Sequence, residues 1–216
     1  MSAPVTLFGY RYSVYTRIAR LVLFEKGVAF RAEEIDPFAS PPPASLRALH
    51  PFGRVPVLRH GDFTLYETAA IARYVDAAFP GPALVPPEPR AAARLAQTVG
   101  LIDAYGYRPL VRQVFSHAVF RPAMGAPARA DAIESGLAAA GPVLAALETI
   151  AAEGVLLDGT AVTLADCHLA PMIDYFLRAA AARPLFDRHP ALARWWAAAS
   201  RRPGLAATDP GLPGPA

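Results

Sequence analysis

The first third of the chain alternates between short apolar runs and segments whose apolar positions have helical spacing. Val5-Thr6-Leu7-Phe8 is short and mostly apolar, which predicts a buried strand. Apolar side chains recur on one side of 16–26, and Gly27 follows as a natural helix stop, so we predict a helix there. Residues 30–35 are a second strand candidate.

The next segment predicts a break, a hairpin and a second helix. The prolines within 37–43 remove backbone donors, so this stretch is neither regular helix nor central strand. Strand-like residues 57–59 and 64–66 flank His60-Gly61-Asp62, which predicts a hairpin turn. A helix over 67–79 follows and ends at a Pro-Gly-Pro sequence. The predicted order is therefore βαβ, loop, ββα.

The remainder of the chain has no convincing strand. Residues 80–89 are rich in proline and are predicted to be a linker. Helical patterns then cover 90–117, 127–153, 163–182 and 190–201. The tail from Pro203 has several Pro and Gly residues, so we expect no helix in it. We predict an α/β domain over 1–79 and an all-α domain over 90–216.

Composition and charge exclude several classes of protein. Charged residues make up only 18% of the 216 residues, so little disorder is expected. The net charge of +3 comes from scattered basic residues, which gives no reason to expect nucleic-acid binding. No apolar run reaches about 18 residues, so no membrane span is expected. A single cysteine, Cys167, excludes an intramolecular disulfide, and with no apolar signal region at residues 1–4 we expect a cytoplasmic protein.

Two short sequences before the second helix indicate a binding edge. The Val55-Pro56 bond precedes a strand and is a candidate cis peptide, which would leave the Val55 backbone open to an extended peptide. The alternative is an ordinary trans turn. Glu67-Thr68 begins the next helix, where exposed N–H groups attract a carboxylate. The alternative there is plain helix capping by an acidic first turn.

These sequences resemble the phi-like, serine-dependent branch of the cytosolic glutathione transferases. Members of that branch carry Asn-Pro-Phe-Gly-Gln-Val-Pro and then Phe-Glu-Ser. This chain has His-Pro-Phe-Gly-Arg-Val-Pro at 50–56 and Tyr-Glu-Thr at 66–68, with the same spacing. A bacterial member of this family is implied, with a thioredoxin-like N-terminal domain and a helical domain carrying the substrate pocket. The implied family activity is glutathione transfer to an electrophile, without a metal, by a homodimer.

The resemblance also implies which residues bind glutathione. It assigns Val55 to the cysteinyl backbone, and Glu67 with Thr68 to the γ-glutamyl end. The implied glutathione-binding residues are Arg54, Val55, Pro56, Glu67 and Thr68. The apolar surface near Phe52 is a candidate for the dimer interface.

The catalytic role carries over to Ser13, which lies twelve residues before Glu25 in a Phe-Glu-Lys-Gly helix end similar to the family's. A hydroxyl that donates to sulfur near a helix N-terminus favours the thiolate. Lowering a thiol pKa by about two units needs roughly 2.7 kcal/mol. The compatible alternative makes Ser13 the N-cap of the first helix. Tyr10, Tyr12 and Tyr15 are competing activators, since tyrosine does this work in other branches.

One part of the family pattern is missing. Before Pro-Phe-Gly, the phi-like pattern has a His-Lys pair that binds the glycyl carboxylate, and here that position holds Pro41-Pro42. A lost charged hydrogen bond costs about 1.5–3 kcal/mol. Arg47, Arg54 and His50 are the candidate replacements.

The second substrate is expected in an apolar pocket lined by aromatic residues. The candidates are Tyr10, Tyr12, Tyr15, Tyr105, Tyr107, Phe115 and Phe120. Such a pocket favours electrophilic, aromatic or halogenated compounds. Thr163 to Asp166 fits a capping box, and we interpret the following Cys167 and His168 as structural.

Two other functions stay open. A glutathione-dependent thiol reductase normally has cysteine where this chain has Ser13, and Cys167 is far away in sequence. A non-catalytic binding or stress protein is the second alternative, because Pro41-Pro42 interrupts the glutathione site.

Overall fold

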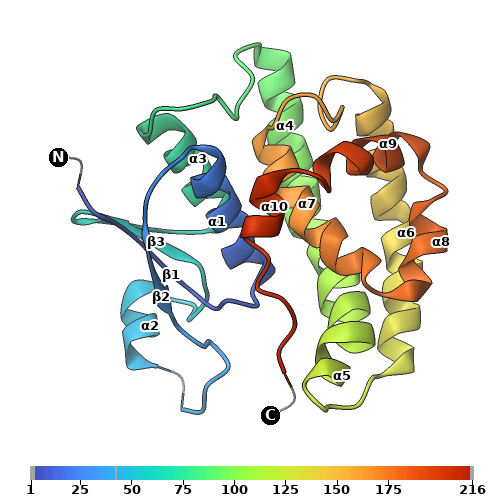
Figure 1. Cartoon of the computed structure of the whole chain (residues 1–216), viewed down its shortest axis with the longest axis horizontal. Coiled ribbons are helices and arrows are strands. Elements are labelled where there is room, and N and C mark those ends of the chain that lie inside the picture. The colour runs from blue at the N-terminus through green and yellow to red at the C-terminus, as the bar shows by residue number, and fades with distance from the viewer. Residues whose placement is uncertain (1–2, 42, 215–216) are drawn as a thin grey trace. The chain divides into compact units, whose positions relative to one another are not determined.

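The computed structural model describes residues 3–41 and 43–214, which form two compact units (Figure 1). The first comprises the described part of Met1–Ala83 together with Ala207–Pro210. The second comprises Leu84–Ala206 and the described part of Gly211–Ala216. The first unit contains the sheet and the second is helical, which confirms the predicted fold class.

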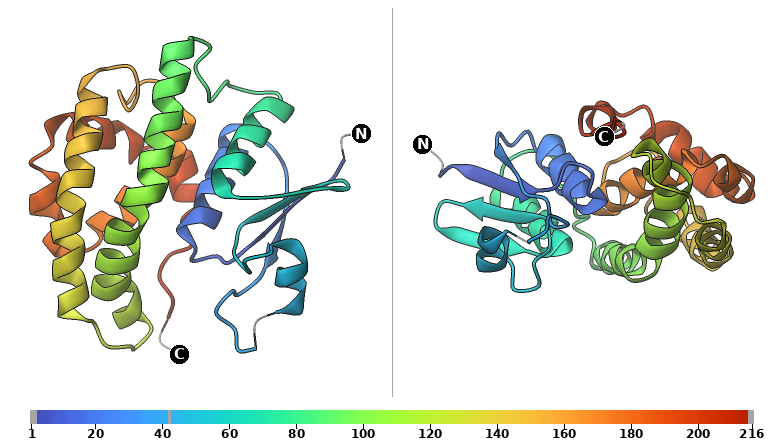
Figure 2. Two further views of the ribbon diagram at one scale, coloured as in Figure 1. Left: turned by 180° about the vertical axis from the view of Figure 1, so that it is seen from behind. Right: turned by 90° about the horizontal axis from the view of Figure 1, so that it is seen from below.

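A four-stranded sheet with the order β2-β1-β3-β4 forms the centre of the first unit. Its strands are β1 (Val5–Gly9), β2 (Arg31–Glu34), β3 (Val57–His60) and β4 (Phe63–Tyr66). Strands β1 and β2 are parallel, and the other neighbours are antiparallel. The helices of the unit are α1 (Val14–Glu25), α2 (Ala44–Leu49) and α3 (Thr68–Ala78). Helices α1 and α3 pack on each other, and α2 lies apart from them (Figure 2).

Helix α1 lies close to the sheet because of a glycine at the end of β1. A Cβ atom on Gly9 would overlap the side chain of Thr16 in the first turns of α1. Only glycine therefore allows this approach. Farther along α1, Ile18 and Val22 are fully buried, in agreement with the apolar side that predicts the helix.

The only lysine of the chain fastens the end of α1. The ammonium of Lys26 donates to the carbonyl of Pro82 at 2.9 Å and to Asp76 at 3.2 Å, and its side chain is 3% exposed. These bonds hold the ends of α1 and α3 and the segment after α3 together. A buried ammonium is tolerated here because it is paired and hydrogen-bonded.

The second unit is a helical bundle. Its elements are α4 (Pro89–Leu101), η1 (Ile102–Phe120), α5 (Arg121–Ala123), α6 (Ala130–Ala152), α7 (Leu164–Leu177), η2 (Ala180–Ala182), α8 (Arg183–Phe186), α9 (Pro190–Ala199) and α10 (Pro203–Ala207). The segment η1 continues α4 as a π-helix and contains Pro109, which has no N–H to donate. Both α6 and α7 pack against η1.

The short helices α2, α5, α8 and α10 lie outside the helical ranges predicted from the sequence. The prediction that no helix forms from Pro203 is wrong, because α10 begins there and buries Leu205. Proline is well tolerated in the first turn of a helix, whose N–H groups have no partner within the helix. Helix α2 follows the proline-rich segment and buries only Leu46, so its sequence has little helical periodicity.

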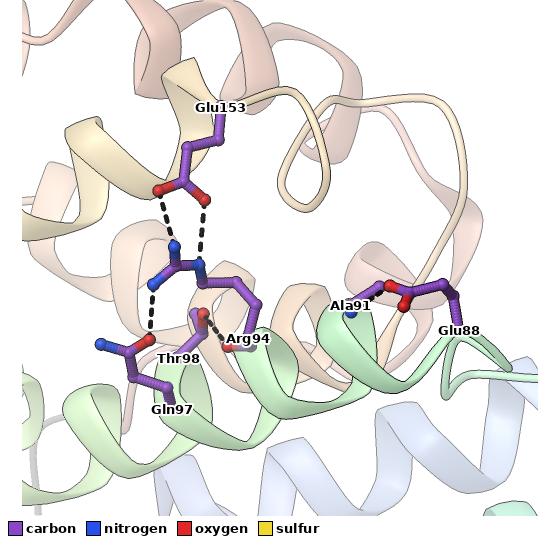
Figure 3. A network of polar contacts seen from close by, with 6 residues as sticks. All are labelled: Glu88, Ala91, Arg94, Gln97, Thr98 and Glu153. Atoms are coloured by element: carbon purple, nitrogen blue, oxygen red, sulfur yellow. Dashed lines mark hydrogen bonds and ion pairs between the residues drawn. The ribbon is translucent and has the colours of Figure 1, made fainter.

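A network of polar contacts joins α4 to the end of α6 (Figure 3). Arg94 forms a two-pronged contact with Glu153, with both nitrogen–oxygen distances at 2.9 Å. Arg94 also donates to Gln97 at 2.7 Å. Glu88 accepts from the backbone N–H groups of Arg90 and Ala91, so it caps the start of α4.

The capping box predicted at the start of α7 is confirmed. Asp166 accepts from the backbone N–H of Thr163 at 2.8 Å and from its hydroxyl at 2.6 Å. The other oxygen of the same carboxylate accepts from the indole N–H of Trp195 at 2.7 Å. The start of α7 and helix α9 are thus held by one buried side chain.

Helix α6 is long and apolar enough to cross a membrane by length and composition. It packs against η1 and α9 within the helical unit. Core helices of soluble proteins pass the same test, so this feature is weak evidence for a membrane span.

Candidate functional site

The strand register brings three sequence segments to one end of the sheet. Gly9 at the end of β1 pairs with Glu34 at the end of β2. Phe8 pairs with Val57 at the start of β3, and Val57 pairs with Tyr66 at the end of β4. The loop before α1, the Val-Pro turn before β3 and the start of α3 therefore lie at the same end of the sheet.

Ser13 is the N-cap of α1 and keeps a hydroxyl hydrogen to donate. Its Oγ accepts from the backbone N–H of Thr16 at 3.3 Å. Within the part of the chain that the structure describes, this hydroxyl has no acceptor for its own hydrogen. The side chain is half-buried, and it sits where the positive end of the helix favours an anion. The capping role and the catalytic role are compatible.

The tyrosines of the same loop are half-buried. Tyr10 and Tyr12 meet edge to face with ring centroids 5.5 Å apart, and Tyr10 also meets Phe38. Burial, followed by the charge of Asp36, raises the pKa of Tyr10 above its ordinary value. Tyr10 therefore stays protonated near neutral pH and can act on a thiolate only as a hydrogen-bond donor. Tyr15 is half-buried in the first turn of α1.

The peptide bond between Val55 and Pro56 is cis, as predicted. Val55 is half-buried, and Pro56 and Val57 are buried. Among the described residues, the structure gives no partner to the backbone N–H and carbonyl of Val55. Gly53, in the turn before them, has a φ of +60° and donates its N–H to the carbonyl of His50 at 2.9 Å.

Glu67 occupies the N-cap position of α3 without capping the helix. Its side chain makes no cap hydrogen bond and is 66% exposed. Its φ of +69° lies in the left-handed region, which is a strained conformation for glutamate. Thr68, the first residue of α3, is buried. The capping interpretation is therefore weaker here than at Ser13, because the Glu67 side chain does not satisfy the first N–H groups of α3.

The sequence pattern did not predict that His50 lies beside Glu67. The ring of His50 is buried and packs on Tyr66, with centroids 4.6 Å apart. Its Nδ1 accepts from the backbone N–H of Phe52 at 3.2 Å, and its Nε2 lies 4.0 Å from a carboxylate oxygen of Glu67. The only signal in the sequence is that histidine stands where the phi-like pattern has asparagine.

The predicted replacements for the missing His-Lys pair differ in exposure. Arg47 in the last turn of α2 and Arg54 in the following loop are exposed. His50 is buried between other partners, so it does not face solvent. Pro41 is exposed and follows a cis bond, and Pro42 lies outside the described residues.

The aromatic candidates of the helical unit do not share one surface. Tyr105 is 68% exposed and lines a groove between η1 and α6 with a volume of about 730 Å³. Phe115 is buried and stacks on Tyr175 of α7 with centroids 4.4 Å apart. Tyr107 and Phe120 are half-buried.

The other candidate groups lie within the helical core. Cys167 and His168 are fully buried in α7. Within residues 3–41 and 43–214, no group of three or more His, Cys, Asp or Glu side chains is arranged to hold a metal ion.

Comparison with known proteins accounts for both units. A family model described as the glutathione S-transferase N-terminal domain matches residues 7–83, and the model of the C-terminal domain matches residues 130–198. Glutathione S-transferase 3 of Zea mays is 30% identical over 218 residues, covering 99% of this chain and 96% of that protein. A glutathione S-transferase of Arabidopsis thaliana is 29% identical over 209 residues, covering 95% of each chain.

Two solved structures are similar to this chain over nearly its whole length. The apo form of glutathione S-transferase III has a TM-score of 0.84 at 28% identity and covers 99% of both chains. The theta class glutathione S-transferase of Xanthomonas axonopodis pv. citri, solved with glutathione bound, has a TM-score of 0.80 at 27% identity. It covers 97% of this chain and 98% of that chain. The chain belongs to the glutathione S-transferase family.

Proposed function

We propose that this glutathione transferase uses the Ser13 hydroxyl to hold glutathione as its thiolate, which then attacks an electrophilic small molecule. The observation that carries the proposal is the hydroxyl hydrogen of Ser13, which is left over after its oxygen has capped α1. Lowering the thiol pKa by two units needs about 2.7 kcal/mol. One charge-assisted hydrogen bond together with the helix dipole supplies an energy of this order. The sulfur is the nucleophile, so Ser13 needs no general base.

Glutathione is held by the other two segments at the same end of the sheet. The unpartnered backbone of Val55 pairs with the cysteinyl residue by strand addition. The carboxylate of Glu67 pairs with the γ-glutamyl ammonium, while Thr68 and the first N–H groups of α3 bind the γ-glutamyl carboxylate. Arg54 and Arg47 are the exposed cations left for the glycyl carboxylate.

The electrophile meets the sulfur beside the tyrosines of the loop before α1. Tyr10 and Tyr12 present two adjacent rings there, which favours an apolar or aromatic substrate. The reaction forms a bond from sulfur to an electrophilic carbon, by substitution with loss of a leaving group or by addition. The chemistry needs reduced glutathione, which supports the proposal of a cytoplasmic location.

Steady-state conjugation of glutathione to chlorodinitrobenzene tests this function. Ser13→Ala is expected to lower kcat by about tenfold or more, because the loss of about 1.4 kcal/mol of transition-state stabilisation is tenfold in rate. Glu67→Ala should instead raise the KM for glutathione with a smaller change in kcat. Binding of glutathione without turnover of a broad panel of electrophiles would contradict the enzymatic proposal and favour a binding protein.

We also propose a homodimer in which Phe52 enters the groove between η1 and α6 of a second copy. Phe52 is 74% exposed in the turn before Gly53, although a large aromatic side chain gains by burial. The groove is mostly apolar and large enough for a benzyl group, at about 730 Å³. Its lining residues include Tyr105, Pro142 and Val143.

Sedimentation at several concentrations tests the dimer. Phe52→Ser and Val143→Arg should each shift the protein to monomer, while Phe38→Ser, at another exposed aromatic, should leave the mass unchanged. A dimer that survives both substitutions would contradict this interface.

A further inference from the structure

The hydrogen bonds of His50 define which nitrogen of its ring carries the proton. Nδ1 receives the backbone N–H of Phe52 at 3.2 Å, so it must present a lone pair. In a neutral ring the hydrogen then lies on Nε2, the nitrogen that faces Glu67. The ring is fixed from both sides by Tyr66 and Phe52.

The same ring links the turn before Val55 to the carboxylate beyond β4. Through its backbone, His50 accepts from the N–H of Gly53 and donates to Leu46, which places the turn on the end of α2. Its Nε2 lies 4.0 Å from a carboxylate oxygen of Glu67, which is too long for a hydrogen bond. Glu67 is strained and mostly exposed, so its carboxylate has room to move.

We propose that His50 is a positioning residue, whose neutral ring orients Glu67 for the γ-glutamyl ammonium and whose protonation lowers the affinity for glutathione. The proposal rests on the proposed function of the site. With glutathione bound, Nε2–H closes on the Glu67 carboxylate and holds it toward the ligand. The Val55 edge is held in place by the bond from Phe52 to Nδ1.

Protonation of His50 disturbs both contacts. A proton on Nδ1 removes the acceptor for the N–H of Phe52 and so releases the turn. The resulting imidazolium also competes for the Glu67 carboxylate and repels the ligand's ammonium. The charged groups that act on the ring are Glu67, which favours protonation, and Arg54, which opposes it. Burial is the largest influence and lowers the pKa of His50 below 6.5.

Binding of S-methylglutathione at pH 5 to 8, followed by calorimetry, tests the proposal. This ligand has no ionisable thiol, so the thiolate at Ser13 does not affect the result. In the wild type, affinity should fall on acidification below the pKa of His50, with a limiting slope of about tenfold per pH unit for one proton. His50→Asn is the matched variant, because the amide oxygen can accept from Phe52 and the amide nitrogen can donate to Glu67 without titrating.

The variants separate this inference from the proposed function. His50→Asn should bind S-methylglutathione near neutral pH within about threefold of the wild type and show a flat profile between pH 5 and 7. His50→Leu should bind at least about tenfold more weakly at every pH, with the folded state checked by circular dichroism. A wild-type profile as flat as that of His50→Asn would overturn the role of His50 and leave the glutathione site intact. Failure of the wild type to bind S-methylglutathione at any pH would instead overturn the proposed function.

A second measurement tests the geometry directly. Nitrogen chemical shifts of the imidazole should show the Nε2–H tautomer of His50 at neutral pH, and they should change when S-methylglutathione binds. An Nδ1–H tautomer would contradict the contact with Phe52 and with it the proposal.

Discussion

At the scale of single residues, the site contains a strained glutamate that does not stabilise its own helix. Glu67 adopts a φ of +69° and leaves α3 without a side-chain cap. A left-handed conformation at a residue other than glycine costs about 1–3 kcal/mol. Such strain is retained where a side chain has a function that glycine cannot supply, and the function we propose for Glu67 is the contact with the γ-glutamyl ammonium.

Glu67→Gly should therefore stabilise the fold and weaken glutathione binding together. Relief of strain exceeds the backbone entropy that glycine loses, so we expect the free energy of unfolding to rise by about 1 kcal/mol. Urea denaturation and calorimetry of glutathione binding measure the two effects. The same substitution at the exposed helical position Glu134 is the control and should lower the free energy of unfolding by about 1 kcal/mol. Equal destabilisation at both positions would contradict the strain at Glu67.

The sequence indicates residues of the site by motif, but it cannot show which side chains meet. The cis bond before Pro56 and the cap at Ser13 are both present in the structure. The contact between His50 and Glu67 has no counterpart in the sequence pattern, because it joins the end of α2 to the start of α3. Phe115 illustrates the same limit, since its helical position did not show that it stacks on Tyr175.

At the scale of elements, the start of a helix can be predicted where the sequence contains residues that cap it by hydrogen bonds. The start of α7 was predictable because Thr163 and Asp166 have capping-box spacing. Helix α10 was not, because its stability comes from burial of Leu205 rather than from its own sequence pattern. The widening of α4 into the π-helix η1 likewise has no signal in apolar periodicity.

Asp166→Ala should destabilise the helical unit strongly. The substitution removes the cap of α7 and leaves the indole N–H of Trp195 without its acceptor. We expect the free energy of unfolding to fall by about 3 kcal/mol, from a lost cap of about 1 and a buried unsatisfied donor of about 2. Asp158→Ala removes turn contacts to exposed Thr160 and is the control, with a loss below about 1 kcal/mol. An equal fall in the free energy of unfolding of both variants, measured by thermal denaturation, would contradict the structural role of Asp166.

At the scale of the whole molecule, a buried histidine makes the stability depend on pH. His168 is fully buried, its Nδ1 lies 2.8 Å from the carbonyl of Leu164, and its Nε2 lies 4.0 Å from Asp103. Burial lowers the pKa of His168 from 6.5 to about 4, in spite of the hydrogen bond to the carbonyl of Leu164, which raises it. Between these two pH values, His168 is therefore protonated to a greater extent in the unfolded chain than in the folded one.

The free energy of unfolding should fall as the pH falls from about 6.5 to about 4, by up to about 3 kcal/mol from His168 alone. His168→Asn keeps a donor for the carbonyl of Leu164 and does not titrate in this range. Denaturation of both proteins at several pH values isolates this contribution, because their other titrating groups are the same. Parallel curves for the wild type and His168→Asn would contradict it.

The central claim is that Ser13 stabilises the thiolate of bound glutathione. The most direct measurement is the ultraviolet absorbance of the thiolate on the protein across pH, for the wild type and Ser13→Ala. We expect the wild type to lower the thiol pKa by about two units from about 8.5, and Ser13→Ala to return it close to that value. A wild-type thiol that titrates as free glutathione does would contradict the account. So would a Ser13→Ala protein that keeps the lowered pKa while Tyr10→Phe or Tyr12→Phe loses it.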